Sequence, residues 1–286
     1  MIDQSQIINR DLSRLQYSSW VIALIYLVSL GLAELLTTLI APLAGMILHG
    51  LIFNALLIQA ALSTKKDVFR FLGVLAFAPL IRLLSLTLPL IQFPQIYWYA
   101  VVGTLLYLAI FICVRITRLG RNEISMRLSW RSIPAQFLIG ISGLLLGYIE
   151  YLILRPEPLI AEFRWEIFLL AALILLVFTG FLEEIIFRGM LQTTAIQYLG
   201  RFGILYVAIL FAILHFGYHS LIDVVFVFIV AVMFGVLVQR TGSLIGVSFA
   251  HGLTNISLYL IFPFLLASPM IKNISPMATV SPGDTA

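Results

Sequence analysis

A series of long, continuous apolar runs constrains the fold most strongly. Each run is close to the length of about 20 residues that an α-helix needs to cross the hydrocarbon layer of a bilayer. Hydrophobic residues make up 62% of the 286 residues and charged residues only 10%, whereas an ordinary globular chain has about 25% charged residues. Only helices and closed barrels satisfy their backbone hydrogen bonds in lipid, and barrel strands would alternate in polarity. The sequence therefore predicts an all-α fold, a polytopic transmembrane bundle of about eight or nine helices.

The first apolar run is too long for the hydrophobic core of a cleavable signal peptide, so we expect it to be retained as the first span. The expected spans cover residues 20–40, 43–62, 71–91, 97–114, 133–154, 167–187, 204–216, 221–238 and 244–266. Residues 1–160 would be N-terminal transmembrane helices of unknown role, and 161–266 a second unit that holds most of the intramembrane polar residues. The end of the chain, 267–286, is rich in Ser, Pro, Thr and Gly and is expected to be disordered.

Basic residues mark one end of the bundle. They fall in three groups that helical hairpins separate, the last of them between Arg115 and Arg131. Because cytoplasmic loops carry the excess of Lys and Arg, we expect this end and the N-terminus in the cytoplasm. The net charge of +4 is then a topology signal. No basic face is joined to groove-reading elements, so nucleic-acid binding is not expected. The single cysteine, Cys113, can form neither an internal disulfide nor a cysteine-based metal cluster.

Two adjacent carboxylates end one apolar helix, at Glu183 and Glu184. An ionisable side chain at membrane depth is costly and usually faces the bundle interior or a water-filled cavity. Glu184 and Arg188 are four residues apart, so they share a helix face and can pair. Glu183 points about 100° away from Glu184. It must find another partner or hold a proton, and a carboxylate in such a position can act as a general base.

Two further apolar helices carry histidines. His215 ends one run, and His251 and Asn255 share a face of the last helix because they are four residues apart. Taken singly, each side chain could be satisfied by an ordinary interhelical hydrogen bond. Taken together with the acidic pair, they favour amide hydrolysis. Glu183 and His215 can hold and deprotonate a water. His251 and Asn255 can donate hydrogen bonds to the oxygen of the tetrahedral intermediate.

These motifs resemble those of the CPBP family of intramembrane proteases, also called the CAAX protease and bacteriocin-processing, or Abi, family. The family pattern occurs in order as Glu183-Glu184-x-x-x-Arg188, Phe211-x-x-x-His215 and His251-x-x-x-Asn255, within residues 161–266. The resemblance implies that the first glutamate and the middle histidine activate water. It implies that the last histidine and the asparagine form the oxyanion hole, with the second glutamate and the arginine in support. The implied activity is that of an endopeptidase acting on a membrane-associated peptide or protein.

The same family is often labelled as metalloproteases. The zinc motif His-Glu-x-x-His is absent here, although two histidines and a glutamate could supply three zinc ligands. The site would then lack a separate general base unless Glu184 left Arg188. We therefore expect hydrolysis without a metal or other cofactor, and zinc is the alternative.

Two other classes of function remain open. One is a non-catalytic membrane scaffold or bacteriocin self-immunity factor that binds a partner through the same polar cavity. The other is a transporter, because intramembrane charges also mark ion paths, although the sequence lacks paired broken helices in two matching halves. The short loops and the lack of targeting signals favour a prokaryotic plasma membrane, where prenylated substrates would not be expected.

Further expectations concern the polar residues around the site. We expect the four catalytic candidates to converge in the half of the bilayer nearer the basic loops, around a cavity that opens to the cytoplasm. Glu34, Arg82 and Glu150 are expected to form interhelical pairs or a polar lining, and His49 to lie at the membrane interface.

Overall fold

The computed structural model describes residues 4–127 and 129–266, with side chains from Ser19 onward. These residues contain no strand, and a single isolated bridge joins Met126 to Ser243. Eight segments of this part of the chain are long and apolar enough to cross a membrane. The predicted all-α membrane bundle is therefore confirmed. The tail that was expected to be disordered, 267–286, lies outside the described residues.

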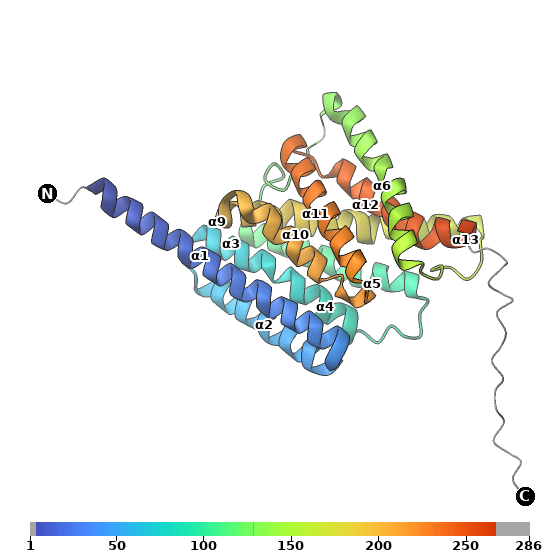
Figure 1. Ribbon diagram of the computed structural model, residues 1–286, viewed down its shortest axis with the longest axis horizontal. Helices are drawn as coiled ribbons and strands as arrows, with labels where there is room; N and C mark the ends of the chain where they lie inside the picture. The colour runs from blue at the N-terminus through green and yellow to red at the C-terminus, as the bar shows by residue number, and fades with distance from the viewer. Residues whose placement is uncertain (1–3, 128, 267–286) are drawn as a thin grey trace, which may run out of the picture.

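Six helices and two shorter segments form the first part of the bundle (Figure 1). They are α1 (Gln4–Leu35), the π-helical η1 (Leu36–Ile40), α2 (Pro42–Leu62), α3 (Lys66–Leu75), α4 (Phe77–Thr87), α5 (Gln95–Thr117), the short 3₁₀ turn η2 (Trp130–Ser132) and α6 (Ile133–Leu154). The helices α3 and α4 belong to one candidate span, Lys66–Thr87. The helix is interrupted at Ala76 because Pro79 has no N–H to donate to the carbonyl four residues earlier.

The second part of the bundle begins with one long helical leg. It consists of α7 (Trp165–Leu175), η3 (Leu176–Phe181), α8 (Leu182–Glu184), η4 (Ile185–Leu191) and α9 (Gln192–Leu199). The chain turns at Gly200, whose φ of +68° suits a residue without a side chain. The remaining elements are η5 (Gly200–Phe202), α10 (Gly203–Ile213), η6 (Phe216–Tyr218), α11 (Leu221–Thr241), α12 (Ile245–Ile256), η7 (Ser257–Ile261) and α13 (Phe262–Leu266). The expected spans 167–187 and 204–216 are thus two legs of one 54-residue run, Trp165–Tyr218.

The helical leg α7 to α9 departs from α-helical hydrogen bonding on both sides of the acidic pair. The segments η3 and η4 are π-helical, and only Leu182–Glu184 between them is α-helical. π-Helical turns are rare and occur frequently at functional sites. The π-helical segments therefore indicate that the part of the leg around Glu183 and Glu184 is a functional site.

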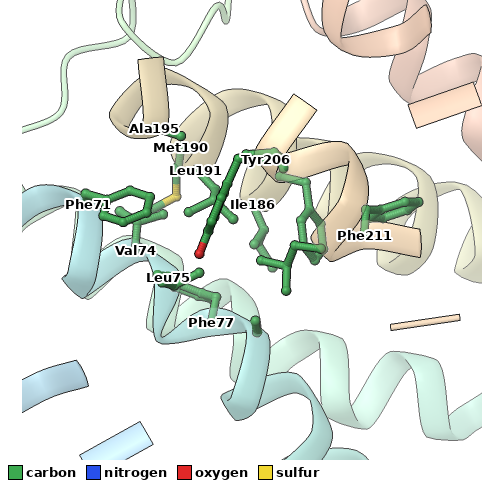
Figure 2. Close-up of a cluster of buried hydrophobic side chains, with 14 of the residues drawn as sticks. Phe71, Val74, Leu75, Phe77, Ile186, Met190, Leu191, Ala195, Tyr206 and Phe211 are labelled. Carbon is green, nitrogen blue, oxygen red and sulfur yellow. The ribbon is translucent and has the colours of Figure 1, made fainter. Parts of the chain in front are cut away.

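One hydrophobic core joins the N-terminal helices to this leg (Figure 2). The ring of Phe71 on α3 stacks on Tyr198 of α9 at 4.7 Å and meets Tyr206 of α10 edge-on at 5.6 Å. Figure 2 shows Val74, Leu75 and Phe77 beside the same cluster. Side chains from α3 and α4 therefore pack directly against the helices that carry Glu183 and His215.

Candidate active site

The second glutamate and the arginine of the first motif form a buried ion pair. Arg188 Nη1 lies 2.8 Å from Glu184 Oε1, and both side chains are almost fully buried. The pairing predicted from their four-residue spacing is confirmed. The guanidinium also lies 4.3 Å from the ring centroid of Phe211, close enough for a cation–π contact. Arg188 is thus held between the acidic pair and the aromatic residue of the second motif.

His251 reaches both glutamates. Its Nδ1 lies 2.9 Å from Glu184 Oε1, the oxygen that also accepts from Arg188, and its Nε2 lies 3.8 Å from Glu183 Oε2. The Glu183 side chain is 31% exposed, whereas that of Glu184 is fully buried. Glu184 is therefore a structural anchor for His251, and Glu183 is the carboxylate that faces open space.

The helical hairpin brings His215 to the level of Glu183. The legs on either side of Gly200 run antiparallel, and the rings of Phe187 and Phe211 meet edge-on at 4.8 Å. His215 follows Phe211 by four residues, and Glu183 precedes Phe187 by four residues. Because the legs are antiparallel, these equal offsets run in the same direction and bring Glu183 and His215 to the same level. The helix α10 has 11 residues, so it is about 16 Å long, roughly half the hydrocarbon thickness of about 30 Å. A helix this short covers only about half of that thickness.

The end of α10 fixes the ring of His215. The backbone N–H of His215 bonds to Ala212 O at 3.0 Å, one residue short of the α-helical partner. Phe211 O is thereby left free and lies 2.8 Å from His215 Nδ1. A carbonyl only accepts, so Nδ1 carries the hydrogen and Nε2 of the neutral ring is an acceptor. That is the tautomer that a general base requires.

Asn255 bonds to a residue that the sequence motifs do not contain. Its Nδ2 donates to Thr179 Oγ1 at 2.8 Å, and that hydroxyl donates onward to Leu175 O. The neighbouring Gly180 permits this contact, since a Cβ there would lie 2.7 Å from backbone atoms of Ser248 and Gly252 on α12. Threonine gives no distinct signal in an apolar helix, where its hydroxyl commonly bonds to the preceding turn.

The predicted site residues converge on two adjoining cavities. A polar cavity of about 70 Å³ is lined by all six residues of the three motifs that were singled out as catalytic or supporting: Glu183, Glu184, Arg188, His215, His251 and Asn255. A larger cavity of about 400 Å³ lies between α4, α5 and the hairpin, and it shares Glu183 and His215 with the first. These two side chains therefore stand where the larger space meets the smaller one.

The larger cavity lies at the end of the bundle away from the basic loops. Its lining includes Ser85 near the end of α4, Gln95 at the start of α5, and Gly217 in η6, all of them exposed. The loop between α4 and α5 is separated by one span from each of the two basic groups nearest to it in sequence, and by three spans from the N-terminal group. The exposed part of this lining thus lies on the side opposite to the basic loops, where the sequence did not place the opening.

Further polar side chains complete the smaller cavity. Glu150, Tyr99, Tyr218 and Tyr259 line it, and Tyr259 donates to the Tyr218 hydroxyl at 2.9 Å. The predicted polar lining by Glu150 is confirmed. The tyrosines could not be found from spacing, because aromatic residues are common near the ends of membrane spans.

A second buried cluster lies beside the hairpin. Arg82 Nε lies 2.5 Å from Glu34 Oε1, which confirms the expected interhelical pair. His49 Nε2 lies 3.4 Å from the same oxygen, and the His49 side chain is fully buried. The expected interfacial position of His49 is wrong, since α1 covers that face of α2.

The described residues contain no group of three or more His, Cys, Asp and Glu side chains that could hold a metal ion. Some nitrogens of the site have other partners. Both nitrogens of His251 face carboxylates, and His215 Nδ1 faces its own helix.

Electrostatics outside the membrane spans is clearest at Glu123, in the loop after α5. The backbone N–H of Gly120 and, less strongly, the guanidinium of Arg70 hold the pKa of the Glu123 carboxyl below its ordinary value. Arg70 also donates to the carbonyls of Thr117 and Arg118 and so caps α5.

Residues 165–257 match the family described as type II CAAX prenyl endopeptidase Rce1-like. This match confirms the resemblance to the CAAX protease family, and it covers all three motifs. It supports an intramembrane protease activity of the CAAX type in general, with substrates embedded in the membrane. Comparison with curated proteins and with solved structures finds no match.

Proposed function

We propose that this integral membrane protein, with its Rce1-like segment 165–257, is an endopeptidase that hydrolyses a peptide bond of a membrane-associated protein or peptide. One observation carries the proposal: Glu183 and His215 line both the polar cavity and the larger cavity beside it. A peptide in the larger cavity would present its carbonyl where these two side chains meet the smaller cavity. That cavity has room for only one or a few waters at about 70 Å³.

Glu183 and His215 would activate the water. The exposed Glu183 carboxylate can take the proton of a water that His215 Nε2 also holds, since the Nδ1–H of that ring is already engaged by Phe211 O. The attacking oxygen forms the new bond to the carbonyl carbon. The proton then passes to the leaving nitrogen as the C–N bond breaks, so Glu183 acts as base and then as acid.

His251 and Asn255 would stabilise the oxyanion. His251 lies between two carboxylates, an arrangement that suits the imidazolium, whose Nε2–H can donate. Asn255 Nδ2 uses one N–H for Thr179 and has a second to offer. Such donors stabilise charge most strongly where water is excluded. No step of this scheme requires a metal ion or other cofactor.

The site accepts substrates from within the bilayer. Apolar side chains of α4 and α5, among them Leu106 and Val102, line the larger cavity, and Trp98 stands near its exposed end. An extended peptide with apolar residues fits that lining. The loop charge favours a cytoplasmic N-terminus in a prokaryotic plasma membrane, which would place this end of the cavity on the outer side.

A cleavage assay tests the proposal. The purified protein in lipid vesicles is mixed with fluorogenic peptides that are tethered to the membrane by an apolar segment. We expect cleavage by the wild type and loss of cleavage in Glu183→Gln. Exposed Glu162, which pairs with Arg164 on the surface, gives the matched control Glu162→Gln, and this variant should cleave at the wild-type rate.

A scaffold or immunity factor that binds a partner through the same cavity is the second candidate. A partner could bind in the polar cavity without being cleaved, so the cavity also agrees with this candidate. A deletion strain separates the two. Full rescue by Glu183→Gln would support the scaffold and contradict the protease, whereas rescue by the wild type alone supports hydrolysis.

A further inference from the structure

We propose that Arg82, with Glu34 behind it, is a positioning residue that fixes the ring of His215 by capping the end of α10. The inference deepens the proposed function and rests on it for the role of His215. It also gives the N-terminal helices, which lie outside the matched segment 165–257, a part in the active site.

The first step is the end of α10. The last carbonyls of a helix have no intrahelical partner and need another donor. Arg82 Nη2 donates to the carbonyl of Leu214, the residue before His215. This bond connects α4 to the turn that carries His215.

The second step is the shape of that turn. The chain tightens at its end, so the His215 N–H bonds to Ala212 O and not to Phe211 O. Tyr218 N continues the tight pattern by bonding to His215 O at 3.1 Å. If α10 continued as an α-helix, the backbone N–H of His215 would take Phe211 O. The ring would lose the acceptor that selects its Nδ1–H tautomer.

The third step is what holds Arg82. The Arg82 side chain is 22% exposed, and its Nε lies 2.5 Å from Oε1 of Glu34 on α1. The Glu34 side chain is fully buried. A buried Glu34 carboxylate without a cation would be strongly unfavourable, and Arg82 supplies that cation. Glu34 therefore keeps the charged fork directed at Leu214 O, and His49 packs against the same carboxylate at 3.4 Å.

The chain offers a matched control. Arg70 is a buried arginine that likewise donates to one carboxylate, Glu123, and to two backbone carbonyls at the end of α5. It lines neither of the two cavities of the site. Arg82→Lys and Arg70→Lys each keep the positive charge and lose the planar guanidinium. Both variants should therefore weaken the end of a helix. Only the end of α10, which Arg82 caps, carries His215.

Two measurements decide the matter. Ring-nitrogen NMR of the labelled protein in micelles reports the His215 tautomer, with assignment by His215→Gln. We expect a single Nδ1–H tautomer in the wild type and in Arg70→Lys, and a tautomer mixture in Arg82→Lys. In the cleavage assay we expect kcat of Arg82→Lys to fall by about tenfold to a hundredfold, with KM within about threefold of the wild type.

The outcomes are separable. An unchanged tautomer in Arg82→Lys, or the same tautomer mixture in Arg70→Lys, would overturn the inference. If the wild type cleaves no peptide, the proposed function fails while the tautomer comparison still decides the role of Arg82. Should Arg82→Lys not fold, Glu34→Gln replaces it, since it frees the guanidinium without removing it, and the same tautomer change is expected.

Discussion

His251 Nδ1 and Glu184 Oε1 lie 2.9 Å apart, and the same oxygen accepts from Arg188 at 2.8 Å. The second glutamate thus fixes the orientation of a histidine on a different helix. The two adjacent carboxylates therefore have different roles. Glu184 is fully buried and fixed, whereas Glu183 is partly exposed to the cavity.

Removing the arginine of this group should destabilise the fold. In Arg188→Met the Glu184 carboxylate would remain buried without its cation, and breaking a buried pair costs about 3–5 kcal/mol. Thermal unfolding in detergent should show a clearly lower midpoint than that of the exposed control Arg164→Met. Equal midpoints in the two variants would mean that the pair contributes nothing to stability.

The contact between Asn255 and Thr179 should matter for rate more than for binding. Thr179→Val removes the acceptor and keeps the shape, so Asn255 would lose its orientation. We expect kcat to fall by about tenfold, against about 10²–10³ for Asn255→Ala, which removes the donor itself. Steady-state cleavage kinetics compare the two. A larger loss of kcat in Thr179→Val than in Asn255→Ala would contradict the assignment of Thr179 as the residue that orients Asn255.

A glycine permits the close approach of η3 and α12. Gly180→Ala would place a Cβ 2.7 Å from backbone atoms, and such overpacking costs about 1–3 kcal/mol. Gly50 on α2 is the matched control, since nothing lies within 4 Å of a Cβ there. Gly50→Ala should leave stability unchanged or raise it slightly. Chemical denaturation in micelles measures both, and equal stability of the two variants would refute the close packing.

The loop after α5 should give a pH-dependent contribution to stability. The pKa of Glu123 is lowered in the native state, so its contribution is present above the unfolded-state pKa and is lost as the pH falls through the native pKa. Wild type should therefore be more stable than Glu123→Gln at neutral pH, and the difference should shrink below about pH 4.5, the ordinary value for a glutamate. A difference that grows on acidification would contradict the assignment.

The fold and the pairing of Glu184 with Arg188 could be predicted from the sequence because both rest on local patterns. Continuous apolar runs specify membrane helices, and the four-residue spacing of Glu184 and Arg188 specifies a shared face. The contacts of Thr179 and Tyr218, and the bond from Arg82 to Leu214 O, could not be predicted, because they depend on which faces of distant helices meet. The buried position of His49 was missed for the same reason.

The position of the larger cavity could not be predicted from the sequence either. The length of α10 and the turn at Gly200 decide the level of His215, and periodicity does not report where a hairpin turns. The π-helical segments η3 and η4 change the helical register around the acidic pair, and no residue pattern predicts them.

The central claim is that Glu183 and His215 act together on one water. Single-turnover cleavage of a membrane-tethered peptide by wild type, Glu183→Gln, His215→Ala and the double variant tests it most directly. Residues that act as a unit are not additive. Each single variant should lose on the order of 10²–10⁴ in rate, and the double variant should cleave no more slowly than the slower single variant. Wild-type rates in either single variant, or losses that multiply in the double variant, would contradict the account.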